Sequence, residues 1–144
     1  MRHQKSGKKL NRNTKQRKAL FKNLLLSLFQ HEEIKTTVPK AKLVKKMADS
    51  LVNSAKEGSL SVRRQIFAFL SNKKIVNKLV DEIAPRFANI GGGFTRLVRL
   101  GSRKGDNAAI AKVELVRKSE VKTKPLAGKI RGKPVDKNTK PETK

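Results

Sequence analysis

Basic side chains dominate the beginning of this chain. Nine Lys and Arg residues precede Glu32, the first acidic residue. A run of like charge without local carboxylates repels itself in solution, and it becomes stable against a dense polyanion such as a nucleic-acid backbone. His3 is a further candidate for contact with a phosphate or a base. The candidate binding residues of this first basic set are Arg2, His3, Lys5, Lys8, Lys9, Arg12, Lys15, Arg17, Lys18 and Lys22.

A second basic set follows the triple glycine at 91–93. It consists of Arg96, Arg99, Arg103 and Lys104. Gly101 and Gly105 flank the last two of these residues, and glycine lets a backbone approach a phosphate closely. We therefore expect a second contact with the same polyanion from a different part of the fold.

The residue types that usually carry catalysis are few here. His3 and His31 are the two histidines, and neither has an aspartate at a spacing typical of a catalytic pair. The adjacent carboxylates at 32–33 and 81–82 are expected on exposed surface, and no metal-ligand spacing is visible. The triple glycine lacks the Lys and Ser/Thr of a phosphate-binding loop. The sequence predicts no enzyme, no cofactor, no metal site and no small-molecule substrate.

The overall charge limits the classes of partner. The chain has 36 basic and 11 acidic residues, a formal net charge of +25 and a pI near 11.0. Self-repulsion of this size opposes compaction, so we expect a nucleic acid or an anionic membrane surface to neutralise part of it. A basic helix on a membrane is usually bordered by Trp or Phe, and Trp and Tyr are absent here. No apolar run approaches the roughly 18 residues of a spanning helix, so the sequence predicts no membrane partner.

Cysteine usage and the N-terminal pattern bear on the compartment. The absence of Cys excludes disulfides, Cys-ligated zinc and thiol chemistry. No apolar segment of signal-peptide type directly follows the basic N-terminus, because the first rich one, at 21–29, continues a helical pattern. We expect a protein that is cytoplasmic or already in its final compartment.

Two helices are predicted in the first half of the chain. Asn13 or Thr14 can cap the first, whose other face is basic. Pro39 is of a type preferred at the first helical position and begins the second helix, which Gly58 ends. The residues expected to point inward are Leu20, Phe21, Leu24, Leu25, Leu28 and Phe29, then Val44, Met47, Ala48, Leu51, Val52 and Ala55.

Two further helices and three strands follow from the pattern. Ser59 or Ser61 can cap a third helix and Ser71 or Asn72 a fourth, which Pro85 should limit. The residues expected to point inward are Val62, Ile66, Phe67 and Leu70, then Ile75, Val76, Leu79, Val80 and Ile83. Segment 34–38 is a short β-branched strand, and segments 94–100 and 108–116 form a hairpin with a long basic tip.

The last predicted strand alternates in character. Ala109, Ala111, Val113 and Leu115 share one face, and Ile110, Lys112 and Glu114 share the other. This alternation predicts that one face of the sheet is buried.

The six Phe residues indicate what kind of nucleic acid is bound. Recognition of single strands needs exposed aromatic rings on which bases stack. Phe21, Phe29 and Phe67 fall on predicted apolar helix faces, where they would pack in the core. For the other three the pattern decides neither way. We therefore expect recognition of duplex shape and backbone rather than of splayed bases.

Several stretches of the chain together resemble one family. They are Met1-Arg2-His3, Gly7-Lys8-Lys9-Leu10 with Arg12, Arg17 and Lys18-Ala19, Ile34-Lys35-Thr36-Thr37, Lys40-Ala41-Lys42, Pro85-Arg86-Phe87-Ala88, Gly92-Gly93-Phe94-Thr95-Arg96, Gly105-Asp106-Asn107-Ala108 and Glu114-Leu115-Val116. In this order and spacing, over residues 1–116, they resemble the bacterial-type large-subunit ribosomal protein seventeen family.

The resemblance implies a fold and a role. The fold would be α/β (α+β), with about four helices packed on a small, mainly antiparallel three-stranded sheet. The role would be non-enzymatic: binding of large-subunit ribosomal RNA near the outer rim of the peptide exit tunnel, beside neighbouring large-subunit ribosomal proteins. Gln4 and Gln16 stand where the family often has basic residues or His, and Phe94 replaces the commoner Tyr. The tail from Lys118 onward exceeds the shared pattern.

The combined interpretation is a structural constituent of the large ribosomal subunit. It would bind 23S-type ribosomal RNA by phosphate neutralisation and shape complementarity, since side chains cannot enter the narrow major groove of an A-form duplex. We expect a basic extended arm over 1–13, a globular RNA-binding domain over 14–116 and a basic, disordered tail over 117–144. The expected location is the cytoplasmic ribosome, and an organellar ribosome stays open.

Two other classes of protein compete with this interpretation. The first is a dimeric, nucleoid-type architectural DNA-binding protein, which often bends DNA with an apolar wedge or a Pro at a ribbon tip. The predicted tip, Ser102-Arg103-Lys104, offers neither. The second is an RNA-modifying enzyme, which would need a cofactor site that the sequence does not show.

Overall fold

The computed structural model describes residues 8–117. In chain order the elements are α1 (Thr14–His31), β1 (Glu33–Thr37), α2 (Val38–Ala55), α3 (Leu60–Leu70), α4 (Lys73–Asn77), the π-helix η1 (Lys78–Ile83), α5 (Ala84–Arg86), β2 (Thr95–Ser102) and β3 (Ala109–Leu115). The strands form one antiparallel sheet in the order β1-β3-β2. The predicted α+β fold, with helices packed on a three-stranded antiparallel sheet, is confirmed.

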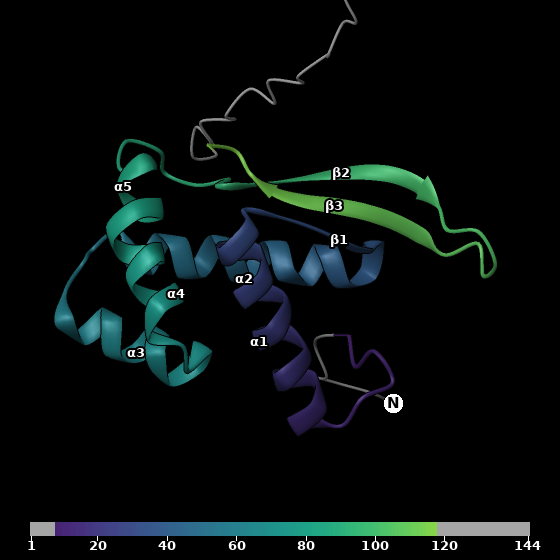
Figure 1. Ribbon diagram of the computed structural model, residues 1–144, viewed down its shortest axis with the longest axis horizontal. Coiled ribbons are helices and arrows are strands. Elements are labelled where there is room, and N and C mark those ends of the chain that lie inside the picture. Colours follow the sequence, from purple (N-terminus) through teal and green to yellow (C-terminus); the bar gives the residue numbers. More distant parts are fainter. Residues whose placement is uncertain (1–7, 118–144) are drawn as a thin grey trace, which may run out of the picture.

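The arrangement is a sheet with helices packed on one face. In Figure 1, α2 runs beneath the sheet, and α3, α4 and α5 gather at one end of the long axis of the molecule. The hairpin of β2 and β3 projects beyond the helices at the opposite end. The loop before α1 lies toward that same end of the long axis.

Local capping explains where the helices begin. The side chains of Asn13, Ser59 and Asn72 accept hydrogen bonds from backbone N–H groups three residues further on, at 2.8, 3.3 and 3.3 Å. In each predicted pair of capping residues, one residue therefore caps the helix: Asn13 rather than Thr14, Ser59 rather than Ser61, and Asn72 rather than Ser71. Val38 is already the first residue of α2, with Pro39 in the first turn, so β1 ends one residue earlier than predicted.

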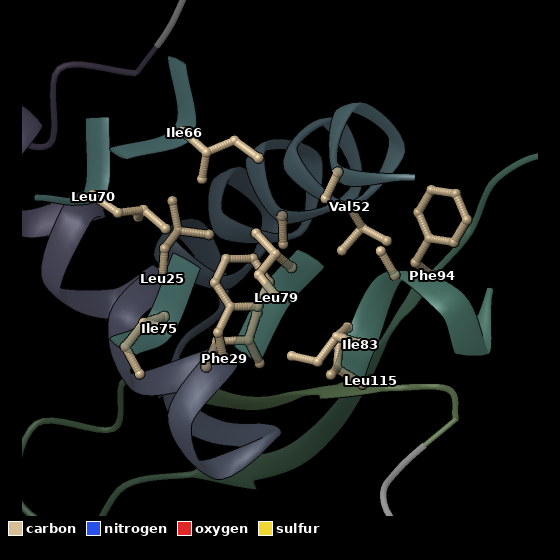
Figure 2. Close-up of a cluster of buried hydrophobic side chains, with 14 of the residues drawn as sticks. Leu25, Phe29, Val52, Ile66, Leu70, Ile75, Leu79, Ile83, Phe94 and Leu115 are labelled. Carbon is tan, nitrogen blue, oxygen red and sulfur yellow. The ribbon is translucent and has the colours of Figure 1, made fainter. Parts of the chain in front are cut away.

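The core joins the helices to the inner face of the sheet. Figure 2 shows Leu25 and Phe29 of α1 among side chains from α2, α3, η1 and β3. Most of the predicted inward faces are confirmed, and several of their members, among them Leu24, Met47 and Leu51, are half-buried at the edge of the core. Phe67 is a clear exception, because 47% of its surface is exposed. The prediction that it packs in the core is wrong.

Two aromatic side chains that the sequence left open belong to the core. Phe87 and Phe94 are almost fully buried, and their rings meet edge-to-face with centroids 5.4 Å apart. The Lys56 ammonium lies 5.4 Å from the centre of the Phe94 ring and donates to the Ile90 carbonyl at 2.7 Å. The buried Phe94 ring therefore helps to hold the 88–94 loop against the core.

The fourth helical segment does not stop before Pro85 as predicted. In η1 the Ala84 N–H donates to the Leu79 carbonyl, five residues back, and the chain then continues as α5 through Pro85 to Arg86. Pro85 follows this change of hydrogen-bond register and occupies the first turn of a new helix, where a missing N–H costs little. The widened turn therefore lets helical backbone pass a proline.

Burial along β3 departs from strict alternation at both ends. Ala111, Val113 and Leu115 are buried as predicted, but Ala109 is exposed because the hairpin extends beyond α2. Glu114, on the outward face, is only 3% exposed because it is covered by ion-paired neighbours. Burial thus depends on what covers each end of the sheet as well as on its two faces.

Candidate nucleic-acid interface

Residues 9–12 form a tight turn before α1, and the extended conformation predicted for 1–13 is wrong there. Leu10 and Asn11 have positive φ angles of 54° and 50°, and the Arg12 N–H donates to the Lys9 carbonyl at 3.2 Å. Leu10 is half-buried against the core, so an apolar side chain anchors this turn. Three predicted binding residues lie outside the described residues: Arg2, His3 and Lys5.

The described part of the first basic set lies on this turn and on α1. We call it the loop–α1 surface; it comprises Lys8, Lys9, Arg12, Lys15, Arg17, Lys18 and Lys22. Among residues 8–117 none of them forms an ion pair with a carboxylate. The Arg12 and Arg17 guanidinium groups instead donate to the carbonyls of Leu10 and Arg12, at 3.1 and 3.5 Å. The surface therefore presents positive charge that the described fold does not neutralise.

The position of this surface at the start of α1 has an electrostatic consequence. The first turn of α1 contains no acidic residue, and Lys15 lies in it. Cations near a helix N-terminus are unfavourable, because the helix dipole already places partial positive charge there. An external anion would offset both the charge of Lys15 and the partial positive charge of the helix N-terminus. The arrangement is therefore suited to a phosphate-rich partner.

The second basic set divides into paired and unpaired residues. Arg96 donates to Oε1 of Glu114 from Nε and Nη2, at 3.0 and 2.6 Å. Arg103 donates to both carboxylate oxygens of Asp106. Arg99 and Lys104 are exposed and have no carboxylate partner within residues 8–117. The structure therefore leaves two of the four predicted hairpin residues free for an external anion.

Asp106 organises the hairpin tip. The Arg103 hydrogen bond, helped by one from the Ala108 N–H, lowers the pKa of Asp106 to about 2, and the same contact raises the pKa of Arg103. The Arg103 N–H also donates to the Ala108 carbonyl at 2.9 Å. Gly101 and Gly105 have φ angles of 106° and 102°, which glycine adopts without strain. The tip is consequently a defined turn.

Two lysines that the sequence argument did not assign to the site lie next to the hairpin. A depression of about 320 Å³ is lined by Lys35 of β1, Lys40 of α2 and Arg103, with Gly101 and Ser102 between them. We call these three cations, together with Arg99 and Lys104, the hairpin surface. Arg99 pairs with the buried Ala111, so it lies on the helix-facing side of the sheet, opposite to Lys35. Strand alternation places Lys35 outward, but only the folded sheet brings it to Lys40. The sequence signal that could have identified these two lysines was their position in the stretches 34–37 and 40–42, which resemble the family.

The described carboxylates are largely held by internal partners. Asp81 pairs with Arg63, Asp49 accepts from the N–H and hydroxyl of Thr95, and Glu33 lies 3.7 Å from Lys112. Most described carboxylates are thus neutralised or hydrogen-bonded by other residues of the same fold. The two basic surfaces therefore present cations that most described carboxylates do not neutralise, because these carboxylates already have partners elsewhere in the fold.

Glu32 corrects the expectation that both adjacent carboxylate pairs are exposed. It is only 5% exposed, in a left-handed turn after α1, and it accepts from Arg86 at 3.0 Å with Lys78 at 3.9 Å. A charge is tolerated in this setting when partners from other elements surround it. These ion pairs therefore tie the end of α1 to η1 and α5. Glu33, Asp81 and Glu82 are exposed as predicted.

A family model described as Ribosomal protein L17 matches residues 20–116. This match covers well over half of the chain. The chain belongs to this family. Membership gives it a structural role in the large ribosomal subunit, in association with ribosomal RNA and other ribosomal proteins. Proteins of this family are in general structural rather than catalytic.

The match to the L17 family covers the two basic surfaces unequally. It includes the whole hairpin surface and Lys22, and it begins after Lys18. The resemblance over Met1 to Ala19 lies outside the matched segment. Interaction roles for the arm and the start of α1 therefore rest on their charge and geometry.

Residues 8–117 contain no group of three or more His, Cys, Asp or Glu that could hold a metal ion. Within the same part of the chain, no helix is long and apolar enough to cross a membrane. His31 is exposed at the end of α1.

Proposed function

We propose that this L17-family protein holds large-subunit ribosomal RNA by neutralising phosphates at two places of fixed geometry. The loop–α1 surface supplies one contact, and the hairpin surface supplies the other. The observation that carries the proposal is the separation of charges: carboxylates are bound internally, and the cations of these surfaces are largely free. Phosphate contacts position a protein without reading base sequence, so specificity would come from RNA shape.

The rigid frame between the two surfaces gives them a defined spacing. α2 lies against the sheet that carries the hairpin, and α1 packs on both α2 and β1. RNA whose backbone follows a different path would therefore meet only one surface. We assign the frame to residues 14–116, a basic arm to 1–13 and a basic tail to 117–144. The family resemblance supports the further proposal that the protein lies near the outer rim of the peptide exit tunnel. We propose a cytoplasmic ribosome, and an organellar one stays open.

Removal of residues 1–12 tests this proposal. The deletion should abolish stable incorporation into large subunits and leave the helical circular-dichroism signal of the isolated protein nearly intact. If about eight phosphates are neutralised, the slope of log K against log salt for the full chain should be near −7 on a duplex. Normal incorporation of the truncated protein would contradict the proposal. DNA association that survives ribonuclease and is lost to deoxyribonuclease would favour the architectural alternative.

A further inference from the structure

The exposed Phe67 lies in a depression that neither basic surface includes. This depression, of about 310 Å³, is formed between α3 and α4. Its apolar lining residues are Leu60, Phe67 and Val76, and its polar ones are Arg63, Arg64, Lys73 and Asn77. Leu60 and Phe67 are 63% and 47% exposed. In Figure 1, α3 and α4 lie at the end of the molecule opposite the hairpin tip.

The spacing of residues on α3 explains why this apolar group is outside the core. Val62, Ile66 and Leu70 face inward and are buried. Leu60, Arg64 and Phe67 recur at helical spacing about a third of a turn away, and they form a second stripe that the described elements leave exposed. An apolar aromatic kept in water between basic side chains indicates a surface that meets a partner.

The charges around Phe67 define the chemistry of that partner. Asp81 is bound by Arg63, which donates to both carboxylate oxygens; this hydrogen bonding lowers the pKa of Asp81 and raises that of Arg63. Arg64 and Lys73 are exposed and have no carboxylate partner among residues 8–117. The rim is therefore net positive beside an aromatic face. This combination suits a nucleotide, whose base stacks and whose phosphate is an anion.

We propose that Phe67 stacks on one unpaired base of large-subunit ribosomal RNA, with Arg64 and Lys73 contacting the phosphates that flank it. This inference rests on the proposed function and adds a third, base-contacting site to two phosphate-contacting ones. The depression lies at the lower limit of typical ligand sites, which fits a single ring system. A docked amphipathic helix would need a longer groove for anchors over several turns.

Substitutions at Phe67 in the full chain test the stacking. With purified large-subunit ribosomal RNA, Phe67→Ala should bind about five- to a hundred-fold more weakly, and Phe67→Tyr should bind like the wild type. Phe67→Leu keeps an apolar side chain without an aromatic face and should behave like Phe67→Ala. Phe69→Leu removes a ring from the same helix outside the depression and serves as the control, although Phe69 is half-buried against the core. Thermal melting of each variant checks that the fold is retained.

Short-wave ultraviolet cross-linking of assembled large subunits identifies the partner directly. The expected product is a nucleotide attached to the peptide that contains Phe67. A cross-link from this peptide to a ribosomal protein, or wild-type affinity of Phe67→Leu, would overturn the stacking site. If the wild-type chain binds the RNA and all Phe67 variants match it, only this inference fails. If the wild-type chain itself does not bind, the proposed function fails as well.

Discussion

The loop–α1 surface and the hairpin surface are both basic, but they hold their cations in different ways. Among residues 8–117, no cation of the loop–α1 surface forms an ion pair with a carboxylate. In the hairpin surface Arg103 is tied to Asp106, and next to it Arg96 is tied to Glu114. Arg99 and Lys104 have no carboxylate partner among residues 8–117. A cation already bound to a carboxylate gains less from a phosphate, because it must give up its internal partner. The first surface is therefore built mainly for charge, and the second also for shape.

The two surfaces also differ in how they are ordered. An apolar anchor at Leu10 and a helix cap at Asn13 fix the loop. Strand pairing and the Asp106 contacts fix the hairpin tip. A fixed tip can approach RNA without losing much conformational freedom on binding.

Neutralising the loop–α1 surface should weaken RNA binding most. Replacement of Lys8, Lys9, Lys15 and Lys18 by Gln should make the salt slope shallower by roughly 3.6, because each phosphate that the protein neutralises contributes about 0.9. Filter binding of large-subunit ribosomal RNA over a salt series measures this slope. The matched control replaces Lys42, Lys45, Lys46 and Lys74 by Gln, so that the net charge falls equally. Equal slopes for both quadruple variants would show that total charge, rather than this surface, determines binding.

Single substitutions on β2 separate paired from unpaired arginines. Arg99→Gln should reduce the salt slope by roughly 0.9 and leave the melting temperature unchanged. Arg96→Gln should change the slope little and destabilise the fold by about 1 kcal/mol. The loss is modest because Arg96 is largely exposed and Glu114 keeps Lys112 at 2.7 Å. The distinction between paired and unpaired arginines is contradicted if Arg96→Gln reduces the salt slope and Arg99→Gln lowers the melting temperature.

The smallest expected effect concerns pH and the hairpin tip. The folded pKa of Asp106, about 2, lies below its ordinary value near 3.9. Its contribution to the tip is therefore present above about pH 4 and is lost as the pH falls toward 2. The Ala108 amide resonance should follow this titration in an NMR series. Asp106→Asn should remove the transition, and a midpoint near 4 in the wild type would disprove the contact in solution.

Much of the fold could be predicted from local pattern. Helix caps, the apolar period of α2 and the alternation of β3 depend on residues close together in sequence. The structure confirms the caps and the α2 period, and it confirms the alternation of β3 except at the two ends of the strand. Pro85 was misjudged because the π-turn before it depends on packing of η1 against other elements. The prediction for Phe67 was wrong because α3 carries apolar residues on two faces, and periodicity does not say which face the rest of the chain covers.

For the candidate site, too, some properties follow from the sequence and others only from the folded structure. The sequence by itself determined the charge, the absence of nearby acids before Glu32, and the family, because these are properties of residue order. Only the tertiary structure decided which cations remain available. Glu114 reaches Arg96 across a strand pair, and Glu32 reaches Arg86 from a distant part of the sequence. Lys35 and Lys40 line one depression beside the hairpin. Coulombic pairing depends on distance in space, which the order of residues along a chain does not contain.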